Sequence, residues 1–226
     1  MSSGSFKTRY MILRKTPFRD TSLVVAGISA DYGRLDFVLK GARAIGKKQF
    51  PTADVFREFH LEFRPSRRPE SMPTAVSLDL AAAHDAIVQS TDCYLAACSF
   101  AAETLRRAQP MLEMNLAWQA FSVMLTRMER THEPERHLML ARLAVLREHG
   151  FLSGAVPYPE LISPLLHCAV DADAPWPDGL DDTALNRLAG WVEMRYRMMS
   201  ACPDSTPRRA FFEAGPGKIR KKRKRV

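Results

Sequence analysis

The chain has 226 residues, enough for one large domain or two small ones, and its 46% hydrophobic content is too high for a disordered protein. No apolar run approaches the ~18 residues that a membrane-spanning helix needs, and the N-terminus lacks the apolar segment of a signal peptide. We therefore expect a cytoplasmic protein. Four cysteines form no C-x-x-C pair, and we expect reduced, buried thiols: Cys93, Cys98, Cys168 and Cys202.

The net charge of +8 is unevenly distributed along the chain. Residues 1–80 carry 14 Lys and Arg against 8 Asp and Glu, whereas residues 81–210 carry 12 against 16. The last sixteen residues, 211–226, carry 7 against 1. Segregated positive charge at both ends favours a polyanionic partner that meets particular surfaces of the protein.

The first eighty residues read as five short strands, because apolar and polar residues alternate in them with a period of two. The alternation predicts that Phe59, Leu61 and Phe63 share one face, and that Val76, Leu78 and Leu80 share another. Strands this short, joined mostly by tight turns, are typical of a five-stranded OB-type barrel. The predicted strands span 8–14, 22–29, 33–40, 55–64 and 74–80.

Near residue 81 the apolar period changes to that of helices. We predict helices over 81–108, 113–130, 134–150 and 181–200, an irregular Pro- and Gly-rich stretch over 151–180, and a last helical turn at 208–214. The fold class is therefore α+β and multidomain, with an N-terminal five-stranded OB-type barrel over 1–80 and an α-helical bundle over 81–214. The basic segment 215–226 has nothing to bury, and we expect it to be disordered.

A cluster of cations follows the third predicted strand, in the segment GRLDFVLKGARAIGKK at 33–48. Each cation placed on a phosphate releases condensed counterions, so such a cluster favours binding to a nucleic-acid backbone. A second cluster lies at the end of the fourth predicted strand. The candidate nucleic-acid-binding residues are Arg34, Lys40, Arg43, Lys47, Lys48, Arg64, Arg67 and Arg68.

The segment 18–43 resembles the RecO family of bacterial recombination mediators. Family members carry a strand of the type R-E-T-S-L-L, then a G-R-L turn into a strand that ends in K-G-A-R. Residues 19–23, 33–35 and 40–43 match these motifs, with Asp20 in place of the usual Glu, and residues 56–64 fit the pattern F-x-x-x-x-L-E-F-R. The match covers about 60 residues; beyond it only the order of elements agrees.

The resemblance implies a protein without enzymatic activity that binds single- and double-stranded DNA and anneals complementary strands. It also implies binding to RecR and to the acidic tail of the single-stranded-DNA-binding protein, and an indirect action on RecA, whose loading onto coated DNA it would assist. A cytoplasmic, nucleoid-associated location during repair would follow. Candidate rims for the acidic tail are Arg106, Arg107, Arg127, Arg130, Arg142 and Arg147.

Aromatic side chains on the barrel bear on whether bases stack on it. Phe37, Phe59 and Phe63 belong to core faces, while Tyr32, Phe50 and Phe56 are either exposed or ordinarily packed, with packing favoured. The C-terminal KIRKKRKRV carries seven cations in nine residues and would act as a flexible electrostatic tether or a solubilising tail.

Signals of catalysis and metal binding are weak. The six histidines lie in no H-E-x-x-H or G-x-S-x-G context, and no glycine-rich phosphate loop is present. Many RecO relatives hold zinc with two C-x-x-C pairs, whereas here only Cys168 falls in the corresponding stretch. We expect no cofactor and no metal, with that stretch held by apolar residues such as Leu161, Leu165, Leu166 and Trp176.

Two alternatives fit the composition. One is an OB-fold RNA-binding or ribosome-associated module with a helical appendage. The other is a scaffold whose barrel binds only protein.

Overall fold

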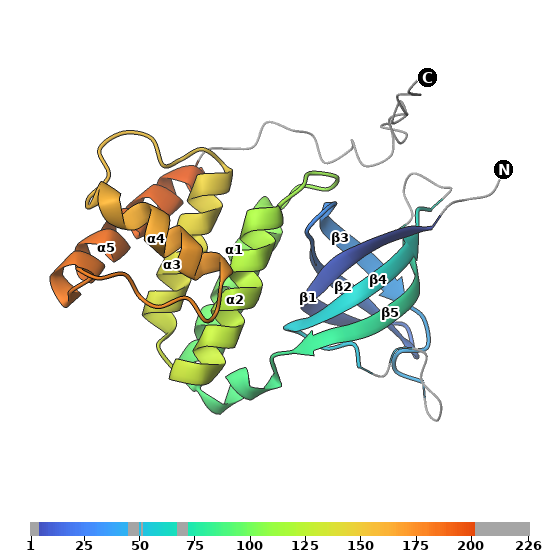
Figure 1. Cartoon of the computed structure of the whole chain (residues 1–226). Coiled ribbons are helices and arrows are strands. Elements are labelled where there is room, and N and C mark those ends of the chain that lie inside the picture. The colour runs from blue at the N-terminus through green and yellow to red at the C-terminus, as the bar shows by residue number, and fades with distance from the viewer. Residues whose placement is uncertain (1–4, 45–49, 51, 67–71, 202–226) are drawn as a thin grey trace, which may run out of the picture.

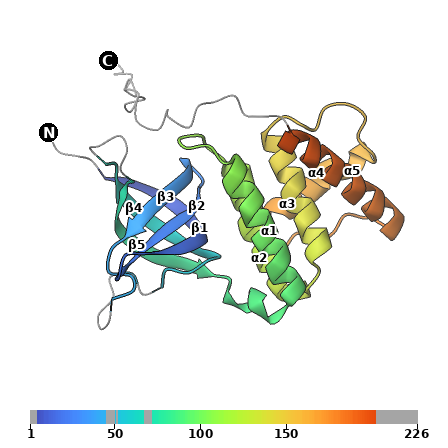
Figure 2. The same ribbon diagram turned by 180° about the vertical axis from the view of Figure 1, so that it is seen from behind.

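The structure is a computed structural model that describes residues 5–44, 50, 52–66 and 72–201. A β-barrel lies beside a bundle of helices, and the first two helices of the bundle face the barrel (Figures 1 and 2). The strands are β1 (Phe6–Phe18), β2 (Ser22–Ser29), β3 (Gly33–Leu39), β4 (Arg57–Arg64) and β5 (Thr74–Ala83).

The barrel is closed in the order β1-β2-β3-β5-β4, with β4 pairing back onto β1. All neighbours are antiparallel except β3 and β5, which meet in parallel through the pair Val38 and Thr74. Five strands closed in this way confirm the expected OB-type barrel followed by a helical region.

The helical region comprises a 3₁₀ helix η1 (Asp85–Gln89) and five α-helices: α1 (Thr91–Arg107), α2 (Asn115–Thr131), α3 (Pro134–Glu148), α4 (Pro159–Val170) and α5 (Asp182–Ala201). The helix predicted over 113–130 is present as α2, and its Trp118, Phe121 and Leu125 are buried. Asp181 caps α5 by accepting a hydrogen bond from the backbone N–H of Ala184 at 2.7 Å. No helix within the described residues is long and apolar enough to cross a bilayer.

Two helical predictions were wrong. The single helix expected over 81–108 is split, because β5 continues to Ala83 and the hydroxyl of Ser90 caps α1 through the N–H of Cys93. The stretch 151–180, expected to be irregular, contains α4, which tolerates Pro164 inside it. Leu161 and Leu165 are buried as expected, and Leu166 and Trp176 pack against the same core (the expected turn at 208–214 and the tail lie outside the described residues).

The expected inner face of β5 was also wrong. Val76 and Leu80 are 37% and 45% exposed, and only Leu78 packs partly against the barrel interior. Irregular pairing with β4 explains Val76, because the register shifts between Glu62 and Phe63 and Val76 is left without a partner. The shift at Val76 breaks the two-residue alternation, so Ala75 instead of Val76 faces the barrel interior opposite Phe63. Leu80 lies in the same register as Leu78, opposite Phe59, so no shift accounts for its exposure.

Two hydrophobic cores share β1. Tyr10 and Ile12 point into the barrel interior, together with Phe37 and Phe59. Their neighbours Met11 and Leu13 point outward and belong to the core of the helical bundle, as do Ala26 and Ile28 of β2. The helices therefore pack on the outer face of β1 and β2, and the two regions form one continuous body.

Gly27 of β2 is required by the ring of Tyr10 inside the barrel. The phenol of Tyr10 crosses the interior and donates a hydrogen bond to the carbonyl of Leu35 at 2.9 Å. A Cβ on Gly27 would lie 2.7 Å from the end of that ring and closer still to the carbonyl oxygen of Met11. Because that carbonyl is fixed in the sheet, the clash cannot be relieved by a side-chain rotation.

A buried histidine joins the two regions. His84, just after β5, places Nε2 3.0 Å from Oε1 of Glu58 on β4 and Nδ1 3.3 Å from Oε2 of Glu129 on α2. Burial alone would lower the pKa of His84, but the hydrogen bonds and charges of Glu58 and Glu129 outweigh it and raise the pKa above 6.5. Burial would likewise raise the pKa of Glu58, yet the hydrogen bonds from His84 and Ser122 leave that pKa lowered.

Gly27→Ala should destabilise the protein by about 1–3 kcal/mol, because it overpacks the barrel interior. Gly190→Ala is the matched control, since a Cβ there meets open space on α5 and should stabilise the helix by about 0.5–1 kcal/mol. Urea denaturation followed by circular dichroism measures both. Equal effects of the two substitutions would contradict the packing argument.

The stability supplied by His84 should depend on pH. Because its folded-state pKa is raised, the contribution is fully present below pH 6.5 and is lost as pH rises through the folded value. The Tm difference between the wild type and His84→Gln should therefore shrink steadily from pH 6 to pH 9. Glu129→Gln removes one of the two carboxylates that raise the pKa of His84. As pH rises, this variant should therefore begin to lose stability at a lower pH than the wild type. A difference that stays constant over this range would mean that His84 is neutral in the folded protein.

Candidate nucleic-acid interface

Lys40 and Arg43 lie where β3 ends, at the end of the barrel that also carries the β1–β2 turn. Both side chains are exposed. The backbone N–H of Arg43 donates to the carbonyl of Thr21 at 2.8 Å, and its guanidinium approaches the carbonyl of Arg19 at 3.4 Å. These contacts hold the segment after β3 against the turn at residues 19–21. Lys40 and Arg43 therefore lie beside the β1–β2 turn and not on an isolated loop.

Arg34 is placed differently from the other candidates. Its guanidinium binds both carboxylate oxygens of Asp36, at 2.8 and 3.2 Å, and donates to the carbonyl of Leu105 on α1 at 2.7 Å. Although Arg34 shares a strand face with Lys40, six residues of strand separate them by about 20 Å. The structure thus commits Arg34 to the junction with the helices and does not bring it to Lys40.

Arg64, at the end of β4, is exposed, and only β5 separates it from the end of β3, near Lys40. It lies opposite Thr74, which lies opposite Val38 of β3. Two strand spacings put its backbone about 10 Å from β3, within reach of a polymer bound at Lys40. The remaining candidates, Lys47, Lys48, Arg67 and Arg68, lie outside the described residues.

The structure adds three residues that the sequence reasoning missed: Arg14, Phe18 and Arg19. Phe18 and Arg14 are exposed on the outer face of β1, opposite Ser22 and Ala26 of β2. Arg19 occupies the turn with φ of 53°, a left-handed conformation that costs a residue with a Cβ about 1–2 kcal/mol. The available signal was FRDT between two strands, since an arginine at a hairpin turn is unusual where Gly or Asn would be unstrained.

The remaining barrel aromatics pack, as favoured from the sequence. Phe50 and Phe56 are buried, and Tyr32 makes edge contacts with Phe6 and Phe63, with ring centroids 6.0 and 5.5 Å apart. Phe37, Phe59 and Phe63 are buried as expected. The buried rings are not available to a bound base without opening the core, whereas Tyr32 is half-buried and packs by its edge contacts.

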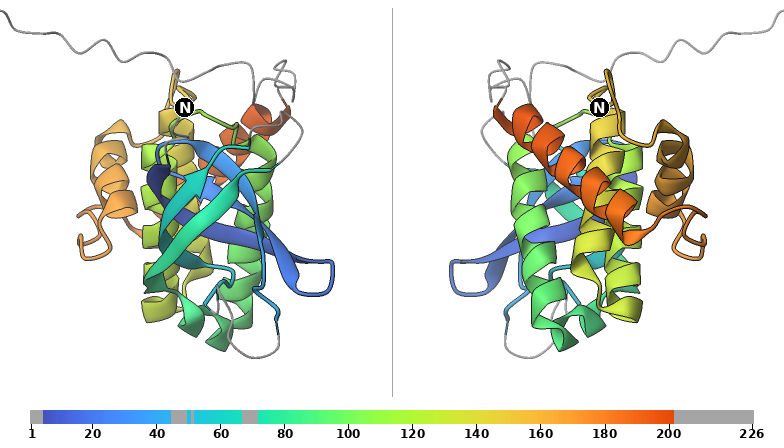
Figure 3. Two further views of the ribbon diagram at one scale, coloured as in Figure 1. Left: turned by 90° about the vertical axis from the view of Figure 1, so that its right-hand side faces the viewer. Right: turned by 90° about the vertical axis from the view of Figure 1, so that its left-hand side faces the viewer.

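The helices cover part of the outer face of β2 and β3, which limits the surface that a ligand could reach. In an OB fold the outer face of strands 2 and 3 and the loops β1–β2 and β4–β5 commonly bind oligonucleotides. Here Ala26 and Ile28 of β2 are covered by the helical core, and Arg34 is tied to α1. The β1–β2 hairpin projects beyond the barrel, clear of the helices (Figures 1 and 3). The open part is therefore the end of the face near that hairpin.

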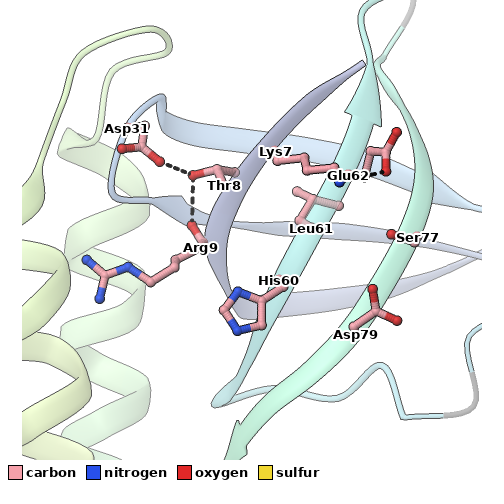
Figure 4. Close-up of a pocket in the computed structure, with 9 residues that line it drawn as sticks. All are labelled: Lys7, Thr8, Arg9, Asp31, His60, Leu61, Glu62, Ser77 and Asp79. Atoms are coloured by element: carbon pink, nitrogen blue, oxygen red, sulfur yellow. Dashed lines mark hydrogen bonds and ion pairs between the residues drawn. The ribbon is translucent and has the colours of Figure 1, made fainter.

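A pocket of about 550 Å³ lies on another part of the barrel, over the outer faces of β1, β4 and β5 (Figure 4). Cations and carboxylates alternate along it, with Lys7 3.9 Å from Glu62 and the hydroxyl of Thr8 donating to Asp31 at 2.6 Å. Mixed charge of this kind gives no net attraction for a polyanion. Its lining residues are Lys7, Thr8, Arg9, Asp31, His60, Leu61, Glu62, Ser77 and Asp79.

Most of the helical arginines proposed as rims for an acidic tail are engaged in structural contacts. Arg127 donates to the carbonyls of Asp171 and Ala174 at 2.9 and 2.7 Å, and Arg130 pairs with Asp173 at 2.6 Å. Arg142 pairs with Glu103 and Glu193, and the guanidinium of Arg107 lies 3.8 Å from the ring centre of Tyr196. Arg106 and Arg147 are exposed.

No group of three or more His, Cys, Asp or Glu side chains gathers into a metal site within the described ranges. Cys168 is buried, and its thiol donates to the carbonyl of Pro175 at 3.2 Å. A comparison of the sequence with protein-family models gives no match, and a comparison with curated proteins gives no match either. The arrangement of cations at the open end of the barrel is therefore the basis for assigning a function.

Proposed function

We propose that this chain is a non-enzymatic DNA-binding protein that binds single and double strands and anneals complementary strands. The observation that carries the proposal is the contact between the segment after β3 and the β1–β2 turn, which groups the exposed cations Arg19, Lys40 and Arg43 at one end of an OB-type barrel. Phosphates of either strand type would be bound there through charge.

Annealing at such a surface needs no chemistry on the DNA. Neutralised phosphates let two complementary strands approach, and base pairing supplies the free energy. The resemblance of residues 18–43 to RecO proteins extends the proposal to a mediator that helps a recombinase load onto DNA coated with single-stranded-DNA-binding protein. Partners of the RecR type and the acidic tail of that coating protein, and a cytoplasmic, nucleoid-associated location, belong to this same proposal.

Lys40→Ala combined with Arg43→Ala should weaken DNA binding about equally across sequences, because the lost contacts are to phosphate. The slope of log K against log salt should fall by up to about 2 for duplex and by about 1.4 for single strands. Fluorescence anisotropy over 50–300 mM salt measures both quantities.

The matched control is Arg106→Ala combined with Arg147→Ala, which removes the same charge from exposed helical positions. It should leave the slope unchanged. A folded Lys40/Arg43 double variant that binds like the wild type would exclude this site.

The wild type should also accelerate annealing of complementary DNA strands, and the Lys40/Arg43 double variant should lose most of that acceleration. Strand pairing monitored by fluorescence quenching between end-labelled oligonucleotides is the measurement. Binding of RNA at least tenfold tighter than DNA, with no annealing, would instead favour the RNA-binding alternative.

A further inference from the structure

The β1–β2 hairpin carries an exposed aromatic ring. Phe18 is 38% exposed, and throughout the described residues it is the one aromatic side chain exposed beyond a third. It sits at the last position of β1 and pairs with Ser22 across the turn. A phenylalanine this exposed at the tip of a projecting hairpin buries little apolar surface on folding, so its presence needs another explanation.

Arg19 follows Phe18 in the chain, and its guanidinium lies over the Phe18 ring. Its guanidinium carbon is 5.2 Å from the ring centre of Phe18, within the range of a cation–π contact. The backbone of Arg19 is left-handed, with φ of 53°. Backbone strain at an exposed position, where glycine would be unstrained, is more common at functional sites than elsewhere.

The phosphate-binding candidates lie next to this ring. Phe18 pairs with Ser22, and the next residue of β2, Leu23, pairs with Leu39, which directly precedes Lys40. Two strand spacings therefore put the backbone of Lys40 about 10 Å from that of Phe18. Arg43 contacts the carbonyl of Arg19. Among the described residues, Arg14, Arg19, Lys40 and Arg43 are exposed near the ring, as is Asp20, while Lys15 is paired with Asp54 at 2.6 Å.

We propose that Phe18 and Arg19 form a stacking platform for an unpaired base of single-stranded DNA, while Lys40 and Arg43 hold the flanking phosphates. The proposal rests on the proposed DNA binding and adds a base contact to it. An aromatic ring amid cations matches a ligand that alternates flat apolar faces with anions. Bases of a duplex are already stacked on each other, so the platform confers a preference for single strands.

Anisotropy with the full chain tests the platform on three ligands of equal length: a thymidine oligonucleotide, the same backbone with abasic sites, and a duplex. The wild type should bind the thymidine strand at least tenfold more tightly than the abasic strand. Phe18→Ala should lose about tenfold for the thymidine strand and nothing for the other two. Phe18→Trp should retain the affinity, and its fluorescence should be quenched by the thymidine strand alone.

Arg19→Gly separates function from folding. Glycine relieves the left-handed strain, so Tm should stay equal or rise, while affinity for the thymidine strand falls. The backbone carbonyl that accepts from Arg43 remains in this variant.

Several outcomes would overturn the platform. Unchanged binding by Phe18→Ala, or an equal loss on all three ligands, would show that the ring makes no base contact. If Phe18→Ala gives such a result while the Lys40/Arg43 double variant still binds DNA more weakly than the wild type, the platform is excluded and the proposed DNA binding stands. A wild type that binds none of the three ligands would overturn both.

Discussion

The arrangement of this protein depends on one strand that is buried on both faces. Residues 10–13 of β1 are all buried, with alternate side chains entering the barrel interior and the helical core. One strand therefore supplies side chains to both cores. A shift of β1 by one residue would move each of these side chains to the wrong face, so the position of the barrel on the bundle is fixed. The ionic contacts of His84 with Glu58 and Glu129 add a second, pH-dependent attachment beside it.

This docking determines which cations remain available. The helices cover the part of the β2–β3 face near Arg34, where a carboxylate and a carbonyl satisfy the guanidinium. They leave the hairpin end open, where Lys40 and Arg43 face solvent. Exposed cations in water attract a single anion weakly, so the proposed binding of DNA at this end would come from several phosphates acting together, with steep salt dependence.

The strand pattern could be predicted from sequence because two-residue alternation survives wherever one face is buried. It placed Phe37, Phe59 and Phe63 correctly in the interior. The same alternation could not separate Arg34 from Lys40, because they share a face and only the position of α1 distinguishes them. On β5 it failed for Val76, since a bulge depends on the partner strand. The sequence did not indicate Phe18 and Arg19, because the predicted first strand ends at residue 14 and leaves both residues in a loop, whereas β1 continues to Phe18.

The small extent of the open sheet has a kinetic consequence. A strand lying across three strand ends would engage toward the low end of the roughly 4–16 nucleotides that a single OB fold accommodates. Most bases of a long molecule would then stay unshielded, and each encounter would be brief. In the proposed annealing, short dwell times and unshielded neighbouring bases would let two strands search for the correct alignment while the protein holds one of them.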